Sequence, residues 1–430
     1  MTIGDNMKKH LIVGNGGAAI SAARAIRAVS LDDEITIISK ENCCAYSPVL
    51  ITYYLGGRIG HEDMFICDES FYRRNKVNAA LGIKATKVDT KLGRVYTDSN
   101  EAFNYDNLLI ATGSSPIVPS IAGVNLPGVF VLRTVDDAER IISFLESKES
   151  VAIIGSGLVA MQALGALVNR GKKAILVARK HQILRMILDL QGARMLEERL
   201  YQRGIDIRLN EPVLGIGIHN KGSKKVISLT SGAELTADAV ILAVGVRPNV
   251  DFLQGSGIEL SGGVVVDQHC RASADGVYAA GDVAEACDPI TGHYTINATW
   301  PSAIEQGRVA GLNMAGKEAL ILRNVRSNIT TLFGFSFASL GLIKAEGMKL
   351  DEIVAEDGAV YRKLFFKEGL LVGAVLLGEI DDAGIIANLI QRHTLFPNLY
   401  EALLRRSVLS HSVNEYYWSI FFRLPQSVGS

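Results

Sequence analysis

Short runs of apolar, mostly β-branched residues alternate with longer amphipathic stretches over the first three hundred residues of the chain. The runs occupy His10–Gly14, Glu34–Ser39, Asn107–Gly113, Val151–Gly157, Lys173–Arg179, Asp238–Gly245 and Gly276–Asp282. Apolar strands that are separated by helices are typical of parallel sheets whose two faces are both covered. The pattern therefore predicts a doubly wound α/β fold.

Two departures from this pattern indicate how the chain is divided. The three prolines of Pro116–Gly128 indicate a linker, and beyond Ala319 hairpin-like strands appear at 335–343 and 361–379. A helical stretch and an aromatic-rich tail at 414–422 follow, so we expect a separate C-terminal α+β domain. A strand, a glycine turn and a helix that begin at Gly14 are repeated from Gly155, which predicts two nucleotide-binding units.

Composition excludes several classes of protein. The 430 residues are 48% hydrophobic and carry a formal net charge of −1. These values exclude general disorder and argue against a nucleic-acid binder that relies on basic charge. The five cysteines show no zinc or iron–sulfur spacing, which fits a reducing cytosol better than a disulfide scaffold. With no apolar run long enough for a membrane span and no signal peptide, we expect a cytoplasmic protein.

The first glycine turn has the spacing G-x-G-x-x-A, from Gly14 through Gly16 to Ala19. One glycine permits the tight turn, the second lets a pyrophosphate approach the backbone, and the small alanine lets the helix pack on its strand. The N-terminus of that helix offers free N–H groups to phosphates. Because Ser39 stands where an acid usually binds the ribose, Glu41 is the candidate for that contact, with an ordinary loop glutamate as the alternative.

The second glycine turn repeats this arrangement at Gly155 and Gly157. The strand that follows its helix ends without an acid, and Arg179 and Lys180 come next. An acid would favour the ribose diol of NAD, whereas an arginine receives the 2′-phosphate of NADP. A solvated basic loop is the alternative, so the choice between the two nucleotides stays open.

Two further strand ends carry polar residues. Thr112 and Gly113 close one apolar strand, and Gly281 and Asp282 close another. An isolated aspartate is more often a helix cap. Together with the other strand ends and in this order, however, the carboxylate of Asp282 is a candidate to hydrogen-bond a ribityl hydroxyl or to bridge to a pyrophosphate.

Five motifs, in this order, resemble the FAD-dependent pyridine nucleotide-disulfide oxidoreductase superfamily. They are GNGGAA, LLIATGS, IIGSGLVA, LAVGVRPN and RASADGVYAAGDVAE, and the resemblance extends over roughly residues 8–316. The resemblance implies two Rossmann-like dinucleotide-binding domains, with the NAD domain inserted into the FAD domain. The implied boundaries are 1–122 and 244–318 for the split FAD-binding domain, 123–243 for the NAD(P)-binding domain and 319–430 for a C-terminal α+β interface or dimerisation domain.

Together with the glycine turns, the resemblance implies the residues that hold the cofactors. For FAD these are Gly14, Gly16, Gly17, Ala19, Glu41, Ser47, Pro48, Ala85, Ala111, Thr112, Gly113, Gly281 and Asp282. For NAD, with NADP not excluded, they are Gly155, Gly157, Val159, Gln162, Arg179 and Gly245. Gln162 stands where many relatives carry a glutamate near the nicotinamide, which leaves its role open.

The segment after the second strand separates the branches of this superfamily. The C-x-x-x-x-C dithiol of disulfide reductases is missing, and Cys43 and Cys44 stand alone in that neighbourhood. The element Tyr46-Ser47-Pro48 and the pattern at 371–378 are similar to rubredoxin reductases, nitrite reductase flavin domains and oxygenase reductase components. The run Cys-Ala-Tyr-Ser-Pro is also similar to the FAD subunits of multi-subunit 2-oxoacid and tungsten aldehyde oxidoreductases such as phenylglyoxylate dehydrogenase.

The resemblance implies an FAD-dependent NAD(P)H:acceptor oxidoreductase. We expect it to be the electron-transfer subunit of an aldehyde or 2-oxoacid oxidoreductase complex, with iron–sulfur or metalloenzyme subunits as partners, since flavin converts hydride steps into one-electron steps. One alternative is a NADH oxidase, peroxidase or CoA-disulfide reductase-like enzyme in which Cys44 or Cys43 is a redox thiol. The other is a flavin-bearing, NADH-responsive interaction protein.

Overall fold

The computed structural model describes residues 7–219, 224–321, 325–344 and 347–392. These residues form two compact units. The first comprises the described residues up to Arg185 and from Glu197 to 321. The second comprises Met186–Leu196 and the described residues from Val325 onward. The aromatic-rich tail that was expected at 414–422 lies outside the described residues.

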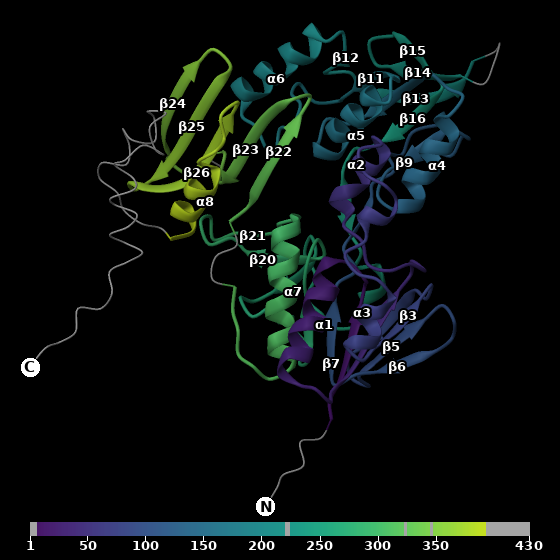
Figure 1. Cartoon of the computed structure of the whole chain (residues 1–430), viewed down its shortest axis with the longest axis vertical. Coiled ribbons are helices and arrows are strands. Elements are labelled where there is room, and N and C mark those ends of the chain that lie inside the picture. Colours follow the sequence, from purple (N-terminus) through teal and green to yellow (C-terminus); the bar gives the residue numbers. More distant parts are fainter. Residues whose placement is uncertain (1–6, 220–223, 322–324, 345–346, 393–430) are drawn as a thin grey trace, which may run out of the picture. The chain divides into compact units, whose positions relative to one another are not determined.

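The first unit begins with a parallel sheet in the order β19-β7-β1-β2-β3. The strands are β1 (Lys9–Val13), β2 (Glu34–Ser39), β3 (Val77–Leu81), β7 (Asn107–Ile110) and β19 (Val277–Ala279). Helices α1 (Gly17–Val29) and α7 (Trp300–Met314) lie side by side beside this sheet (Figure 1). Strand β19 and helix α7 follow a second complete sheet in the chain, so this first sheet is closed by residues from both sides of an insertion.

Small residues let α1 and α7 approach closely. A Cβ added to Gly307 would lie 2.2 Å from the carbonyl oxygen of Ala18, and one added to Gly311 would lie 2.5 Å from that of Ala22. The facing side of α1 is made of alanines and isoleucines that are almost fully buried. Apolar residues at helical spacing therefore form the helix, and glycines on its partner set how near the two backbones lie.

The second parallel sheet has the order β12-β11-β10-β16-β9. Its strands are β9 (Val129–Val131), β10 (Ser150–Ile154), β11 (Lys173–Val177), β12 (Asp206–Arg208) and β16 (Ala239–Leu242). Helix α4 (Val135–Leu145) leads from β9 to β10, α5 (Leu158–Asn169) from β10 to β11, and α6 (Leu190–Gln202) precedes β12. A capping box of Thr134 and Asp137 begins α4.

Smaller elements complete the first unit. They are β4 (Ala85–Asp89), β5 (Arg94–Thr97) and β6 (Ala102–Asn104); β13 (Val213–Ile218), β14 (Lys225–Leu229) and β15 (Glu234–Ala237); β8 (Ser114–Pro116) paired with β17 (Val246–Pro248); and β18 (Val264–Val266), β20 (Ala284–Cys287) and β21 (Tyr294–Thr295). Short helices are α2 (Ile51–Leu55) and α3 (Glu69–Arg74), with single turns at Pro48–Leu50, Glu62–Met64 and Asp251–Leu253.

The second unit contains an antiparallel sheet in the order β22-β23-β26-β25-β24. Its strands are β22 (Ser327–Leu332), β23 (Phe335–Gly341), β24 (Asp351–Asp357), β25 (Val360–Lys367) and β26 (Leu370–Leu377), followed by α8 (Ala383–Arg392). On one face the Tyr361 hydroxyl donates to Asp189 at 2.6 Å. On the other, the buried Arg362 pairs with Asp382, just before α8.

The predicted fold class is confirmed by the two parallel sheets and by the C-terminal antiparallel sheet with its helix. The boundaries that were predicted for three domains stay predictions. Within the part of the chain that the structure describes, no helix is both long and apolar enough to cross a bilayer.

Candidate functional site

A cavity of about 590 Å³ lies in the first unit at the carboxyl ends of β1, β2 and β7. Open α/β sheets bind ligands at this edge of the sheet. Eight residues predicted to hold FAD line the cavity, together with both candidate thiols: Gly14, Gly16, Glu41, Pro48, Ala85, Ala111, Thr112, Gly113, Cys43 and Cys44. Residues that are up to about a hundred positions apart in the sequence thus converge on one site.

The glycine turn at the floor of this cavity has the geometry that a phosphate site needs. Gly14 has a φ of +119°, and a Cβ there would lie 2.0 Å from the carbonyl oxygen of Ala111, so only glycine can occupy this position. A Cβ on Gly16 would meet nothing within 4 Å, which leaves space beside the backbone. Helix α1 begins at Gly17 without a side-chain cap and without an acid in its first turn, so its N–H groups are available to an anion.

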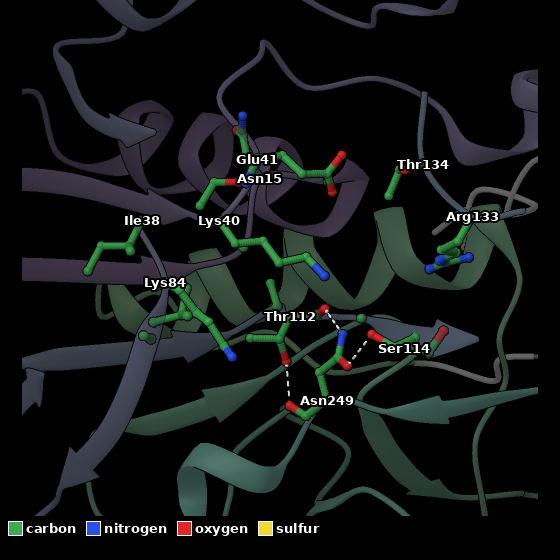
Figure 2. Close-up of a pocket in the computed structure, with 18 of the residues that line it drawn as sticks. Asn15, Ile38, Lys40, Glu41, Lys84, Thr112, Ser114, Arg133, Thr134 and Asn249 are labelled. Atoms are coloured by element: carbon green, nitrogen blue, oxygen red, sulfur yellow. Dashed lines mark hydrogen bonds between the residues drawn. The ribbon is translucent and has the colours of Figure 1, made fainter. Parts of the chain in front are cut away.

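Cations that sequence reasoning missed surround the cavity. Figure 2 shows Lys40 and Lys84 on one side and Arg133 on the other. The ammonium groups of Lys40 and Lys84 form no ion pair with a described residue, and both side chains are exposed. Lys40 and Lys84 could both have been found from the sequence, because they stand beside the predicted Glu41 and Ala85. The charge and the free N–H groups together fit the pyrophosphate of a dinucleotide.

Asn249, also missed, holds the strand ends around the cavity together. Its side-chain amide donates to the carbonyl of Thr112 at 2.8 Å, and the Thr112 hydroxyl donates to the carbonyl of Asn249 at 2.9 Å (Figure 2). Asn249 also accepts from the Ser115 hydroxyl at 2.7 Å. It is the last residue of the motif LAVGVRPN, so the motif contained the signal although its role was not assigned.

Glu41 lines the cavity but is already hydrogen-bonded. The Tyr46 hydroxyl donates to its carboxylate at 2.7 Å, and burial and this carboxylate raise the pKa of Tyr46. In Figure 2 the Glu41 side chain extends on the side of Arg133, away from Lys84. Contact between Glu41 and a ribose stays a prediction.

Five of the residues predicted to hold FAD do not line the cavity: Ser47, Gly17, Ala19, Gly281 and Asp282. Ser47 and Ala19 are buried. A Cβ on Gly17 would lie 2.6 Å from the ring of Trp300, which gives this glycine a packing reason within the α1–α7 contact. Asp282 accepts from the Ser114 hydroxyl at 3.0 Å and from Arg133 at 3.1 Å, and these two residues do line the cavity.

Both candidate thiols are held neutral by their surroundings. Burial, and after it the charge of Glu41, raises the pKa of the Cys43 thiol to about 11. Burial and the neighbouring Cys67 raise the pKa of Cys44. The thiolate is the nucleophilic form of cysteine, so this environment opposes thiol chemistry at neutral pH.

The residues predicted for NAD(P) form a second group at the carboxyl ends of β10, β11 and β16. Gly155 repeats the geometry of Gly14: its φ is +138°, and a Cβ would lie 2.1 Å from the carbonyl oxygen of Ala243. Gly157 faces open space at the start of α5, as Gly16 does at α1. Around it are the exposed Val159, the half-buried Gln162, the exposed Arg179 after β11, and Gly245 after β16. The structure therefore separates the two groups but leaves each role a prediction.

Two family models match the chain. One, described as pyridine nucleotide-disulphide oxidoreductase, covers residues 8–307. The other, the rubredoxin NAD+ reductase C-terminal domain, covers residues 327–394. The two matches include both parallel sheets and the antiparallel sheet of the second unit.

Individual relatives span nearly the same length. The chain is 32% identical over 392 residues to the NADH-dependent phenylglyoxylate dehydrogenase subunit epsilon of Aromatoleum evansii, covering 90% of this chain and 92% of that one. It is 31% identical over 371 residues to a NADH oxidase of Methanocaldococcus jannaschii, covering 84% and 82%. A solved NAD-dependent persulfide reductase from A. fulgidus has a TM-score of 0.84 and 26% identity, covering 90% of this chain and 77% of that one.

Proposed function

Because the chain belongs to the pyridine nucleotide-disulphide oxidoreductase family, we propose that it is the electron-transfer subunit of an aldehyde or 2-oxoacid oxidoreductase complex. In general terms, the chain is an NAD(P)H-dependent flavin oxidoreductase of the rubredoxin reductase type, with FAD and NAD(P) as cofactors. When bound, FAD would supply the conversion of a two-electron hydride step into single-electron steps toward a metal centre. The protein orients the two nucleotides and leaves the flavin accessible to an acceptor.

The cavity favours electron transfer over thiol chemistry. The observation that carries this choice is Cys43, which lies in the cavity as a neutral thiol because burial raises its pKa to about 11. Similarity to a dehydrogenase subunit along nearly the whole of both chains supports a multi-subunit enzyme, and the C-terminal domain of the rubredoxin reductase type supports an iron–sulfur partner. The rival is a thiol-dependent oxidase or reductase, favoured by the presence of Cys43 and Cys44 in the cavity and by the relative named as a NADH oxidase.

The double replacement Cys43→Ser and Cys44→Ser separates these functions. We expect NAD(P)H-dependent reduction of a ferredoxin or of ferricyanide at pH 7 to stay within about twofold of the unmodified protein, because hydride transfer to flavin uses no thiol. Steady-state rates and FAD content provide the measurement, and Cys287→Ser, an exposed cysteine away from the cavity, is the matched control. A fall in these rates of about 100-fold or more would instead show a thiol-dependent enzyme, because removing a catalytic nucleophile lowers kcat by at least this much.

Purification from the native source tests the proposed complex. We expect a tagged chain to recover further subunits that contain iron and acid-labile sulfide, with a reduced-state electron paramagnetic resonance signal of iron–sulfur centres on addition of NAD(P)H. Mass spectrometry identifies the subunits. Recovery of the flavoprotein alone, at low salt and with its FAD retained, contradicts the complex.

For the nicotinamide nucleotide we propose a preference for NADPH. Arg179 and Lys180 are exposed after β11, and neither side chain is paired with a described residue. The backbone N–H of Leu184 donates to the carbonyl of Ser156 at 2.7 Å, which brings this segment beside the second glycine turn. Because no acid directly follows β11 in the sequence, we infer that these two cations recognise a 2′-phosphate.

A further inference from the structure

Two extended segments of the first unit pair with each other, one before the turn at Pro48–Leu50 and one before α3. Tyr46 and Phe65 are partners in an antiparallel bridge. Backbone hydrogen bonds of 2.9 Å flank this pair on both sides, from Ser47 to Met64 and from Ile66 to Ala45. Bonds in these positions define a non-hydrogen-bonded pair, in which the two Cα atoms lie about 4.5 Å apart.

The same register places Cys44 opposite Cys67, two residues further along each segment. Tyr72 holds the segments together at this end, because its hydroxyl accepts from the N–H of Ala45 at 3.2 Å and from the Cys67 thiol at 3.7 Å. Side chains alternate along extended backbone, so Cys44 and Cys67 lie on one face of the paired segments. Both also pack against the apolar core that contains α1. The two thiols are therefore neighbours.

Cys43, the adjacent residue, has different surroundings. Burial and then the charge of Glu41 raise the pKa of the Cys43 thiol. The pKa of Cys44 is raised by burial, then by Cys67, and then by the acids at the start of α3. The partner of Cys67 is therefore Cys44 and not Cys43.

We propose that Cys44 and Cys67 are a modification site, at which a low-molecular-weight disulfide such as glutathione disulfide forms a reversible disulfide bond. A disulfide requires two Cα atoms about 4.4–6.8 Å apart, and opposite residues of a non-hydrogen-bonded pair meet this condition. The bond differs from the C-x-x-x-x-C dithiol that is missing from the chain, because its two cysteines come from separate segments. It is a modification of the protein and not a step in turnover.

The bond forms in two exchange steps. Cys67 precedes the exposed Asp68, whereas Cys44 lines the cavity, so the Cys67 thiolate attacks one sulfur of glutathione disulfide and releases one glutathione. The Cys44 thiolate then attacks the Cys67 sulfur of the mixed disulfide, which forms the Cys44–Cys67 bond and releases the second glutathione. Two cysteines are oxidised, one glutathione disulfide is reduced, and the two thiol protons leave on the two glutathione molecules.

Burial favours the bond once it has formed. A disulfide carries no charge, so the burial that opposes the Cys44 thiolate does not oppose the oxidised form. A thiol whose pKa is raised is also a poor leaving group, so the bond resists reduction. Tyr72 keeps its other contacts on oxidation, since its hydroxyl still donates to Asn15 at 3.0 Å and accepts from Ala45. The bond thus ties a residue of the cavity wall to the segment before α3.

The test treats the reduced, full-length holoprotein with excess glutathione disulfide at about pH 8, where more of each thiol is ionised. Free thiols are then blocked, and the peptides are mapped by mass spectrometry without reduction. We expect more than half of the chains to contain a peptide that joins Cys44 to Cys67, and dithiothreitol to remove it. Cys43→Ser is the matched control and should form the bond to the same extent. Cys44→Ser should instead carry glutathione on Cys67.

A second measurement asks whether the fold brings the thiols together. In glutathione buffers the equilibrium constant for the bond should be about 30-fold or more higher in the folded holoprotein than in the chain unfolded by guanidinium chloride. This ratio equals the factor by which the bond stabilises the fold, and about 30-fold is at the lower end of what disulfides provide.

Three results would overturn the inference. In the first, the folded holoprotein forms no Cys44–Cys67 bond although the exposed Cys287 takes up glutathione, which shows that the oxidant is active. In the second, Cys43 takes the place of Cys44 in the joined peptide. In the third, the equilibrium constants of the folded and the unfolded chain agree within threefold. All three are read on the unmodified protein, so a variant that does not fold leaves the test intact.

Discussion

Gly14→Ala is expected to abolish FAD retention, whereas Gly155→Ala should retain FAD and lose its reduction by NAD(P)H. The two glycines have nearly the same surroundings: a Cβ would lie 2.0 Å from a carbonyl oxygen at Gly14 and 2.1 Å at Gly155, each at a φ well above zero. Such distances are far inside van der Waals contact, so the strand and the turn must separate at each site. The same steric change therefore reports on two different nucleotides.

Bound FAD, counted from its absorbance per protein chain, provides the first measurement. Anaerobic stopped-flow bleaching of the flavin provides the second. For Gly155→Ala we expect NAD(P)H to reduce the flavin at least about 100-fold more slowly, a barrier change of about 2.7 kcal/mol, while dithionite still reduces it fully. Retention of FAD by Gly14→Ala at full stoichiometry contradicts the assignment of the first turn.

Gly171→Ala is the matched control for these two variants. Gly171 also has a positive φ, of +75°, but a Cβ there would meet nothing within 4 Å. The substitution therefore introduces the backbone penalty of about 1 kcal/mol without the steric clash. We expect normal FAD content and normal reduction, with only a small fall in the unfolding temperature.

Arg179→Asp should reverse the choice between the two nicotinamide nucleotides. We expect kcat/KM for NADPH to fall about 100-fold, because a charge-assisted contact is replaced by repulsion of the 2′-phosphate. The value for NADH should be maintained or rise, since an acid at this strand end hydrogen-bonds the ribose diol. The ratio of the two kcat/KM values, measured with ferricyanide as acceptor, reports the switch.

Arg203→Asp introduces the same charge change in the loop between α6 and β12. Arg203 is exposed after α6, at the amino end of β12, whereas Arg179 follows the carboxyl end of β11. We expect the control to leave the ratio unchanged, because screening removes long-range effects at ordinary salt. The proposal is contradicted if the unmodified protein prefers NADH by tenfold or more and Arg179→Asp leaves the ratio of the two kcat/KM values unchanged. Arg179 and Lys180 would then belong only to a solvated loop.

The strands and the glycine turns were predictable because their signals are local. Apolar runs predict β1, β2, β10 and β11, and the spacing of Gly14 and Gly16 predicts the tight turn after β1. The repeat at Gly155 was equally visible. Local spacing also implied the two parallel sheets, because each turn must follow a buried strand and open a helix.

Contacts between distant segments were not predictable in the same way. Arg133 meets Asp282 across 149 positions, and Tyr361 meets Asp189 across 172. No spacing rule connects such pairs. Gly17 shows a related limit, since the motif assigned it to FAD while the structure gives it a packing reason against Trp300. A single sequence does not distinguish a glycine that a ligand requires from one that a neighbouring helix requires.

The split of the first sheet also constrains how the protein is made. During translation, β7 leaves the ribosome well before its neighbour β19, and at typical rates the interval is on the order of ten to thirty seconds. During that time the second sheet can fold, but the edge of β7 that later pairs with β19 has no partner strand. An unpaired apolar strand edge can associate with other chains. Because β19 completes the first sheet only after the second sheet has been synthesised, we expect the cavity at the end of the first sheet to form late in the biogenesis of this chain.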